Sequence, residues 1–204
     1  MDNNKITNIN KDCILPCIKR LSIQNNELQQ FGGITEWKTL EFINLNDNKL
    51  KGIPKEIKNL NLLKRLRLSN NEIEIMSDEI GELSELKELQ LFNNKIKTIP
   101  LSIGNLVKLE ILDLSKNQIS NLPLTLGYLE KLETWKINDN PLISPPIEIA
   151  ITWKDLIGYF EDLLKGSKKC NFLKLIIVSK FYLEILFKEE KNYLNNKFFL
   201  NNFD

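Results

Sequence analysis

Histidine is absent from the 204-residue sequence, and cysteine occurs only at Cys13, Cys17 and Cys170. The absence of histidine excludes Ser–His and Cys–His nucleophilic catalysis and removes the commonest general base. Three irregularly spaced cysteines do not suit a disulfide framework or a zinc site, which indicates a reducing intracellular compartment. We therefore expect a cytoplasmic protein that is not an enzyme and that needs no cofactor and no metal ion.

The sequence also lacks an excess of either charge and any long apolar run. Its 28 basic and 27 acidic side chains give a formal net charge of +1, which provides no general attraction to nucleic acid or to an acidic membrane. The longest apolar stretch, residues 172–187, is interrupted by Lys174, Lys180 and Glu184 and is too short to span a bilayer. The polar amino terminus, MDNNKITNINKD, does not have the apolar region of a signal peptide. We expect no nucleic-acid partner and no membrane insertion.

What the sequence does contain is a repeat. Three consecutive segments of 23 residues align throughout: LKRLRLSNNEIEIMSDEIGELSE (63–85), LKELQLFNNKIKTIPLSIGNLVK (86–108) and LEILDLSKNQISNLPLTLGYLEK (109–131). The frame extends back to Leu40 and forward to Leu132, and a 22-residue version begins at Ile18. One asparagine marks each copy, at Asn26, Asn48, Asn71, Asn94, Asn117 and Asn140. Such self-similarity at a fixed period predicts a repeat architecture with six units.

Each unit begins as a strand and continues as a return segment. Leu66 and Leu68 alternate with Arg65 and Arg67, which is the periodicity of a strand with one buried face. The asparagine that follows can satisfy backbone groups where the chain turns inside a crowded interior. Proline is expected to start the return segment at Pro54, Pro100 and Pro123, and glycine to mark a tight bend at Gly81, Gly104 and Gly127. Because one unit cannot bury its own apolar face, the units must stack into a solenoid.

The pattern L-x-x-L-x-L-x-x-N-x-L-x-x-L-P-x-x-I-x-x-L over residues 18–146 resembles the 23-residue class of the leucine-rich-repeat family. The resemblance implies an α/β solenoid with a curved parallel sheet on its inner face and irregular or short helical return segments. The end copies depart from the pattern: Phe31-Gly32-Gly33 replaces the Leu-Pro segment in the first, Trp135 replaces a core leucine in the last, and Pro145-Pro146 ends the array. Terminal repeats are expected to be atypical because they close the core against water.

A capping helix is predicted directly after the repeats. Apolar residues recur at helical spacing at Trp153, Leu156, Ile157, Phe160, Leu163 and Leu164. Thr152 and Asp155 have the spacing of a capping box, and Gly166 lies where a helix would end. We expect a helix over about 152–165 and divide the chain into an N-terminal cover (1–17, with Ile14, Leu15 and Cys17 as a lid), six repeats (18–146), a capping helix (147–166) and a tail (167–204).

The segment LLKGSKKCNFLKLIIV resembles the junction between repeats and GTPase domain in Roco proteins, the family of the leucine-rich-repeat kinases. In that family a strand like LKLIIV leads into a phosphate-binding loop, which requires several glycines. The last glycine of this chain is Gly166, so we expect no nucleotide binding. Residues 173–178 are therefore interpreted as the first strand of a missing domain, and the alternative is that the tail packs as a helix on the last repeat.

The outward positions of the strands contain the residues expected to bind a partner. They are Phe42, Arg65, Arg67, Glu88, Phe92, Ile111 and Asp113. Aromatic and arginine side chains with polar neighbours are enriched at protein interfaces. The sequence therefore predicts a protein-interaction module, a scaffold or adaptor in intracellular signalling. The alternative is the targeting portion of a Roco-type GTPase or kinase whose catalytic domains are missing from this chain.

Overall fold

The computed structural model describes residues 1–10, 12 and 17–164. Residues 1–161 form one compact unit. The expected strand over 173–178, the tail that follows it, and the lid residues Ile14 and Leu15 lie outside the described residues.

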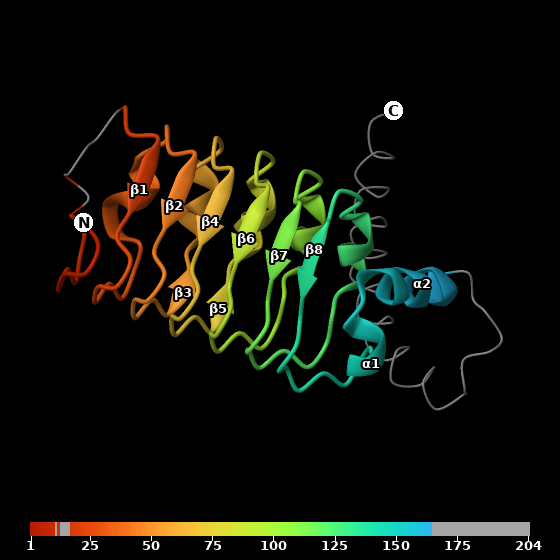
Figure 1. Cartoon of the computed structure of the whole chain (residues 1–204). Coiled ribbons are helices and arrows are strands. Elements are labelled where there is room, and N and C mark those ends of the chain that lie inside the picture. The colour runs from red at the N-terminus through yellow and green to blue at the C-terminus, as the bar shows by residue number, and fades with distance from the viewer. Residues whose placement is uncertain (11, 13–16, 165–204) are drawn as a thin grey trace, which may run out of the picture. The chain divides into compact units, whose positions relative to one another are not determined.

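Six short strands form one parallel sheet in which each repeat contributes one strand. The strands are β1 (Arg20–Ser22), β2 (Phe42–Asn44), β4 (Arg65–Arg67), β6 (Glu88–Gln90), β7 (Ile111–Asp113) and β8 (Thr134–Lys136). They lie side by side in chain order, as Figure 1 shows. Equivalent positions of neighbouring repeats pair directly, so that Arg65 lies between Phe42 and Glu88. Two further strands, β3 (Gly52–Ile53) and β5 (Ile75–Met76), pair with each other along the return path.

The return segments contain short 3₁₀ helices rather than α-helices. They are η1 (Gly32–Glu36), η2 (Lys55–Asn59), η3 (Asp78–Glu82), η4 (Leu101–Asn105) and η5 (Leu124–Tyr128). Pro54, Pro100 and Pro123 precede three of them in an extended conformation, which suits the fixed φ of proline. Ser77 adopts the same conformation before η3, with φ −71° and ψ 152°, so proline favours this geometry without being required for it.

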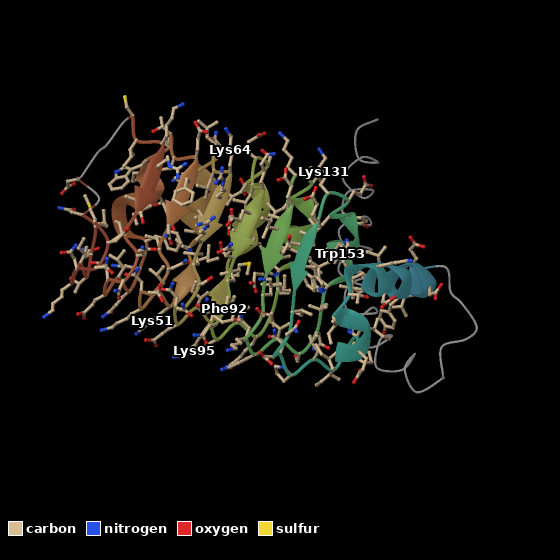
Figure 2. All side chains as sticks on the ribbon, viewed as in Figure 1. Lys51, Lys64, Phe92, Lys95, Lys131 and Trp153 are labelled. Carbon is tan, nitrogen blue, oxygen red and sulfur yellow. The ribbon has the colours of Figure 1, made fainter. Side chains whose placement is uncertain are left out.

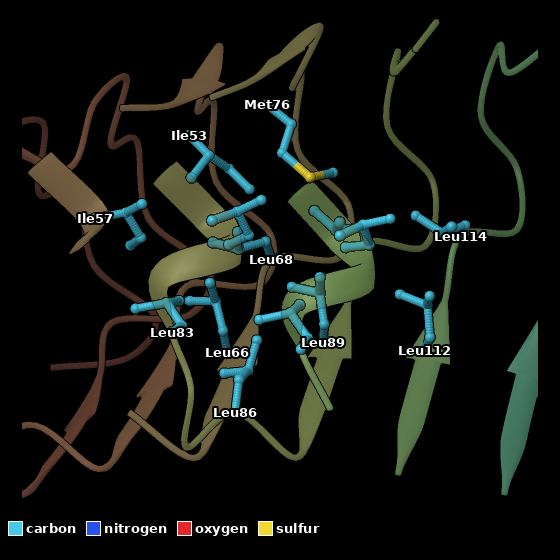
Figure 3. Packing of buried hydrophobic residues seen from close by; sticks show 14 of the residues in the cluster. Ile53, Ile57, Leu66, Leu68, Met76, Leu83, Leu86, Leu89, Leu112 and Leu114 are labelled. Carbon is cyan, nitrogen blue, oxygen red and sulfur yellow. The ribbon is translucent and has the colours of Figure 1, made fainter. Parts of the chain in front are cut away.

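The core is a stack of leucine and isoleucine side chains between the sheet and the return segments. Leu66, Leu89 and Leu112 occupy equivalent strand positions and are fully buried. Figure 3 shows them in a row against buried side chains of the return path, including Leu83 and Ile57. Burial of such side chains contributes about 1.5–3 kcal/mol each, so the repeated leucines are the main source of stability. The predicted leucine-rich-repeat solenoid is confirmed.

The recurring asparagines form a buried ladder of hydrogen bonds. Asn94 donates from Nδ2 to the carbonyl oxygens of Leu68 (3.0 Å), Leu91 (3.1 Å) and Phe92 (3.4 Å). Its Oδ1 accepts from the backbone N–H of Ile73 at 2.9 Å. The amide thereby joins its own repeat to the preceding one. Asn48, Asn71, Asn117 and Asn140 make the same set of contacts, including donor bonds to carbonyls one repeat back.

The residue before each ladder asparagine has a positive φ. These residues are Asn25, Asp47, Asn70, Asn93, Lys116 and Asp139, with φ between 52° and 59°. Asparagine and aspartate tolerate this left-handed conformation better than other side chains, which explains five of the six positions. Lys116 is the exception.

The N-terminal segment continues the repeat geometry one unit further than predicted. Asn4 lies 22 residues before Asn26 and donates to the carbonyl oxygens of Met1 and Asp2, as a ladder asparagine does. Asn3 has the positive φ of the preceding position. Ile6 and Ile9 pack against the core from this segment. Cys17 is exposed, contrary to the expectation that it covers the core.

The C-terminal end is closed by α1 (Ile147–Ala150) and α2 (Trp153–Leu164), which confirms the predicted capping helix. Thr152 caps α2, because its Oγ1 accepts from the N–H of Asp155. Trp135, at the position of a core leucine, donates from Nε1 to the carbonyl of Ala150 at 2.7 Å and contacts the ring of Trp153. The larger indole therefore connects the last strand to the cap.

The glycines of the return segments are explained by close packing and not by the predicted tight bend. A Cβ on Gly81 or Gly104 would lie 2.4 Å from a carbonyl oxygen of the next 3₁₀ helix, that of Ser102 or Thr125. Neither glycine has a positive φ. Gly127, in the equivalent position of η5, would meet only the ring of Phe160 at 3.9 Å. The close approach of the next 3₁₀ helix therefore explains Gly81 and Gly104 but not Gly127.

The ladder predicts that Asn94→Leu destabilises the fold although leucine is the more apolar residue. The N–H of Ile73 loses its partner in the interior and the carbonyls of Leu68, Leu91 and Phe92 each lose one donor, so we expect a loss of about 1–3 kcal/mol. Denaturant melts of the variant and the parent measure it. Asn105→Leu, the same exchange at an exposed site of η4, serves as the control and should leave the midpoint nearly unchanged. Equal midpoints for Asn94→Leu and the parent would refute the assigned role.

The packing of the 3₁₀ helices predicts opposite outcomes for one substitution at two equivalent sites. Gly104→Ala should lower the free energy of unfolding by about 1–3 kcal/mol, because the new methyl group overlaps the backbone of Thr125. Gly127→Ala should leave it unchanged or raise it slightly, because the site is open and alanine restricts the unfolded chain. Thermal melts of the two variants side by side provide the comparison. A loss of the same size at both sites would show that backbone flexibility, and not close packing, selects glycine.

Candidate binding face on the strands

Three positions in each repeat point away from the core on the strand side. They are the first and third residues of each strand and the residue two positions further on, which in the fourth repeat are Glu88, Gln90 and Phe92. We call this surface the strand face. All seven residues predicted to bind a partner belong to it. The register places Phe42, Arg65, Glu88 and Ile111 in one row, Arg67 and Asp113 in a second, and Phe92 in a third.

Arg67 and Glu88, both predicted to meet a partner, instead bind each other. Nε of Arg67 lies 2.7 Å from Oε1 of Glu88, and Nη2 lies 3.3 Å from Oε2. The carboxylate is well buried, because only 6% of Glu88 is exposed. A two-point pair of this kind fixes the orientation of both groups. Glu88 is therefore occupied within the fold and presents no free carboxylate on the strand face.

Phe42 supports two of the arginines. The guanidinium carbon of Arg20 lies 4.6 Å from the centre of the Phe42 ring, and that of Arg67 lies 5.4 Å from it. Such cation–π contacts contribute about 0.5–1 kcal/mol each at exposed sites. The ring is thus a platform that orients guanidinium groups, rather than an apolar anchor open to a partner. Arg20 was not among the predicted site residues, and the register of β1 with β2 reveals its role.

Arg20 and Arg65 are both exposed and form no ion pair with any carboxylate of the described residues. Glu88 lies in register with Arg65, but both of its oxygens bind Arg67. Asp2, beside β1, accepts from the hydroxyl of Ser22 and from the backbone N–H of Gln24. Two guanidinium groups at one end of the strand face are therefore free to bind a partner.

The apolar part of the strand face lies one to two strands further along. Phe92 and Ile111 are both half-buried. Nζ of Lys116 lies 5.3 Å from the centre of the Phe92 ring. Lys116 is the residue that departs from asparagine or aspartate at the positive-φ position, and that departure was the only signal in the sequence that could have identified it. Asp113 accepts from the hydroxyl and the N–H of Ser115, and its Oδ2 lies 3.5 Å from Nζ of Lys136.

Lysine–glutamate pairs between neighbouring repeats border the strand face at both ends of the strands. Glu41 lies between Lys64 (2.7 Å) and Lys19 (3.1 Å) before the strands begin. Lys95 pairs with Glu72 at 2.9 Å beyond the strands, and Figure 2 shows Lys64 and Lys95 at these opposite ends. The borders are thus largely neutralised, whereas the centre of the face keeps uncompensated charge.

These pairs also make the borders sensitive to acid. The hydrogen bonds from Lys64 and Lys19 hold the pKa of Glu41 below its ordinary value. A lowered pKa in the folded state means that the pair stabilises the fold above the pKa of the unfolded chain. This contribution is lost as the pH falls through the folded pKa. The pairs are exposed and screened by salt, so each contributes little by itself.

The described residues contain no group of three or more metal-ligating side chains that could hold a metal ion. Within the same residues, no helix has the length and apolar character needed to cross a bilayer. The chemical features of the strand face are therefore free guanidinium groups, two half-buried apolar side chains and polar neighbours. This combination can bind another molecule.

The buried Arg67–Glu88 pair predicts a coupling free energy that a double-mutant cycle can measure. Arg67→Met leaves the Glu88 carboxylate buried without its partner and should cost about 1–3 kcal/mol, less than for a fully buried pair because a third of Arg67 is exposed. Arg67→Met combined with Glu88→Met removes both charges and should recover much of that loss. Denaturant melts of the parent, both single variants and the double variant give the coupling. A double variant whose loss equals the sum of the two single losses would show that the two charges do not interact.

Comparison with family models assigns two parts of the chain to leucine-rich repeats. Residues 39–60 match one such model, described as Leucine Rich Repeat, and residues 63–119 match another, described as Leucine rich repeat. No curated protein sequence matches the chain at a significant level.

Many solved structures resemble the fold, and three illustrate the range. A leucine-rich-repeat protein of Leptospira interrogans is 33% identical with a TM-score of 0.62, over 64% of this chain and 34% of that one. The repeat ectodomain of a membrane receptor kinase from Arabidopsis thaliana, in complex with Casparian strip integrity factor 2, is 34% identical with a TM-score of 0.58, over 61% and 16%. A plant peptide hormone receptor in complex with the ligand RGF2 is 32% identical with a TM-score of 0.56, over 68% and 23%.

The chain spans about a third or less of the length of these structures. What it shares with them is the fold of the repeat array. The two matched parts fall within the array from β1 to β8. This array is a leucine-rich-repeat solenoid.

Proposed function

We propose that the chain is a protein-interaction module that binds a partner on the strand face and acts as a scaffold or adaptor in intracellular signalling. The observation that carries the proposal is the composition of this face. Half-buried Phe92 and Ile111 lie one to two strands from the unpaired guanidinium of Arg65, all on a rigid parallel sheet. Aromatic and arginine side chains held on a rigid support are the usual anchors of protein interfaces.

The comparisons support a protein ligand. Leucine-rich-repeat folds are generally interaction modules without catalytic activity, and two of the similar structures are receptors in complex with Casparian strip integrity factor 2 and with RGF2. In our proposal this chain has the same general role, with its own partner. We also propose that it is cytoplasmic, on its low cysteine content.

A second candidate function is the targeting portion of a Roco-type GTPase or kinase. Only the resemblance of the segment after the repeats favours it, and most of that segment lies outside the described residues. Genomic sequence beyond the codon for Val178 separates the two candidates. An in-frame G-x-x-x-x-G-K-[ST] motif there would favour the Roco alternative, because that motif cradles phosphate.

The test of the proposed function removes apolar contacts from each face in turn. Phe92→Ala with Ile111→Ala should weaken capture of the natural partner at least about tenfold, because apolar anchors dominate interface energies. The matched control is Leu101→Ala with Val107→Ala, which removes exposed apolar side chains from the return side. Phe92 and Ile111 are half-buried, and Leu101 and Val107 are exposed, so none of the four substitutions should unfold the protein. Thermal melts check that each variant is folded. We avoid Arg67 as a test residue because its removal leaves Glu88 unpaired.

Partner captured from cell extract is identified, purified and titrated calorimetrically against the parent and both variants. Loss of binding in the return-side pair with full binding in the strand-face pair would place the interface on the other face and reject the proposal.

A further inference from the structure

The chain uses arginine at one place only. It contains three arginines among its 28 basic side chains, and all three, Arg20, Arg65 and Arg67, lie on the strand face within its first three strands. The remaining basic residues are lysines, several of which form the border pairs. Lysine serves as well as arginine for solubility, whereas only the planar guanidinium binds a carboxylate at two points. The clustering of arginine therefore points to recognition.

The three arginines have different surroundings. Arg67 binds Glu88 and packs on the ring of Phe42. These two contacts fix the positions of the Phe42 ring and the Arg67 guanidinium group. Arg20 is stacked on the same ring, so its guanidinium group is oriented before any partner arrives. Arg65 lies beside Phe42 in register and is exposed. Arg20 and Arg65 are two strand spacings apart, which is about 10 Å.

The charge of this cluster is not balanced within the part of the chain that the structure describes. Three guanidinium groups lie near two carboxylates: that of Glu88 binds Arg67, and that of Asp2 accepts from Ser22 and Gln24. The nearby border adds Lys19 and Lys64 around Glu41, which leaves a further positive charge beside the cluster. Farther along the face, Asp113 lies beside Lys136 and Lys116 lies over the ring of Phe92, whereas all three guanidinium groups lie at the first three strands.

We infer that the cluster of Arg20, Arg65 and Arg67 on Phe42 is a docking site for an acidic peptide segment of the partner. Arg20 and Arg65 would each bind one carboxylate, with the two carboxylates about 10 Å apart. The ring of Phe42 holds the guanidinium group of Arg20 in position. Arg67 does not bind the ligand, because its guanidinium group already binds Glu88. The inference rests on the proposed function, since it identifies the chemistry of the partner at the strand face.

The spacing can be tested with a peptide of known geometry. A polyproline II helix has three residues per turn and rises about 3.1 Å per residue, so glutamates at every third position lie on one side about 9 Å apart. The probe is therefore the fluorescein-labelled peptide Glu-Pro-Pro-Glu-Pro-Pro-Glu, and the control peptide replaces each Glu by Gln. Fluorescence anisotropy with the full chain should show binding of the Glu peptide, weakening with salt, and no binding of the Gln peptide.

The variant pair is Arg20→Gln with Arg65→Gln, which removes two exposed charges and leaves the Arg67–Glu88 pair in place. We expect its affinity for the Glu peptide to fall at least about tenfold, as for loss of bidentate contacts. The matched control is Lys55→Gln with Lys58→Gln in η2, which removes the same charge from two exposed sites on the return side. The control should stay within about twofold of the parent, because exposed charges on the far side are screened.

Three results would overturn the inference. The first is no binding of the Glu peptide by the parent. The second is an equal loss in both variant pairs, which would indicate general attraction to anions. The third is tighter binding of a short oligothymidylate that the arginine variants abolish, which would identify phosphate rather than an acidic peptide as the ligand.

The outcome is separable from the test of the proposed function. If Phe92→Ala with Ile111→Ala abolishes capture of the natural partner while Arg20→Gln with Arg65→Gln does not, the strand face binds a partner but not through its arginines. If neither pair affects capture, the proposed function itself is wrong. Circular-dichroism melts of all variants ensure that a loss of binding is not a loss of fold.

Discussion

The hydrogen bonds of the buried asparagines are the constraint on which the rest of this structure depends. After each strand the chain turns while it is still inside the core, where some backbone groups, such as the N–H of Ile73, have no backbone partner. Asn94 satisfies three carbonyls and one N–H there, and the same arrangement recurs at Asn48, Asn71 and Asn117. Since an unpaired buried group costs about 1–3 kcal/mol, the spacing of asparagine in the sequence must match the spacing of the turns in space.

This constraint leaves the strand face free to vary. Because each ladder asparagine links its repeat to the previous one, equivalent positions stay in register from β1 to β8. Side chains in one row therefore meet their counterparts in the neighbouring repeats, and their chemistry can differ without disturbing the core. The border rows have become lysine–glutamate pairs, and the central rows carry the arginines, Phe42 and Phe92.

Closing the two ends of the array requires departures from the repeat. At the C-terminal end, the indole of Trp135 takes the place of leucine and binds the carbonyl of Ala150, so the last strand is joined to the helices that cover it. At the N-terminal end, Ile6 and Ile9 pack on the core from a segment that keeps the turn geometry at Asn3 and Asn4. The same physical need explains both: the apolar face of a terminal repeat has a neighbour on one side only.

The sequence by itself determined the period, the fold and the capping helix, because these depend on patterns along the chain. The leucine spacing specifies which side chains are buried, and Thr152 with Asp155 specifies where α2 begins. The sequence also identified the strand face correctly as the outward surface of the sheet. It could not show which of the seven predicted residues are free, because that depends on contacts between side chains of different repeats.

Only the tertiary structure showed that Arg67 and Glu88 bind each other and that Arg20 shares the ring of Phe42. It also showed that Gly81 and Gly104 leave no room for a side chain because the backbone of the next 3₁₀ helix lies against them. The equivalent Gly127 has no such neighbour. In each case residues about 20 or more positions apart are brought within a few ångströms. The sequence pattern predicts whether a residue lies in a strand or a turn and whether its side chain is buried. Which side chain of a neighbouring repeat it contacts depends on how the repeats stack.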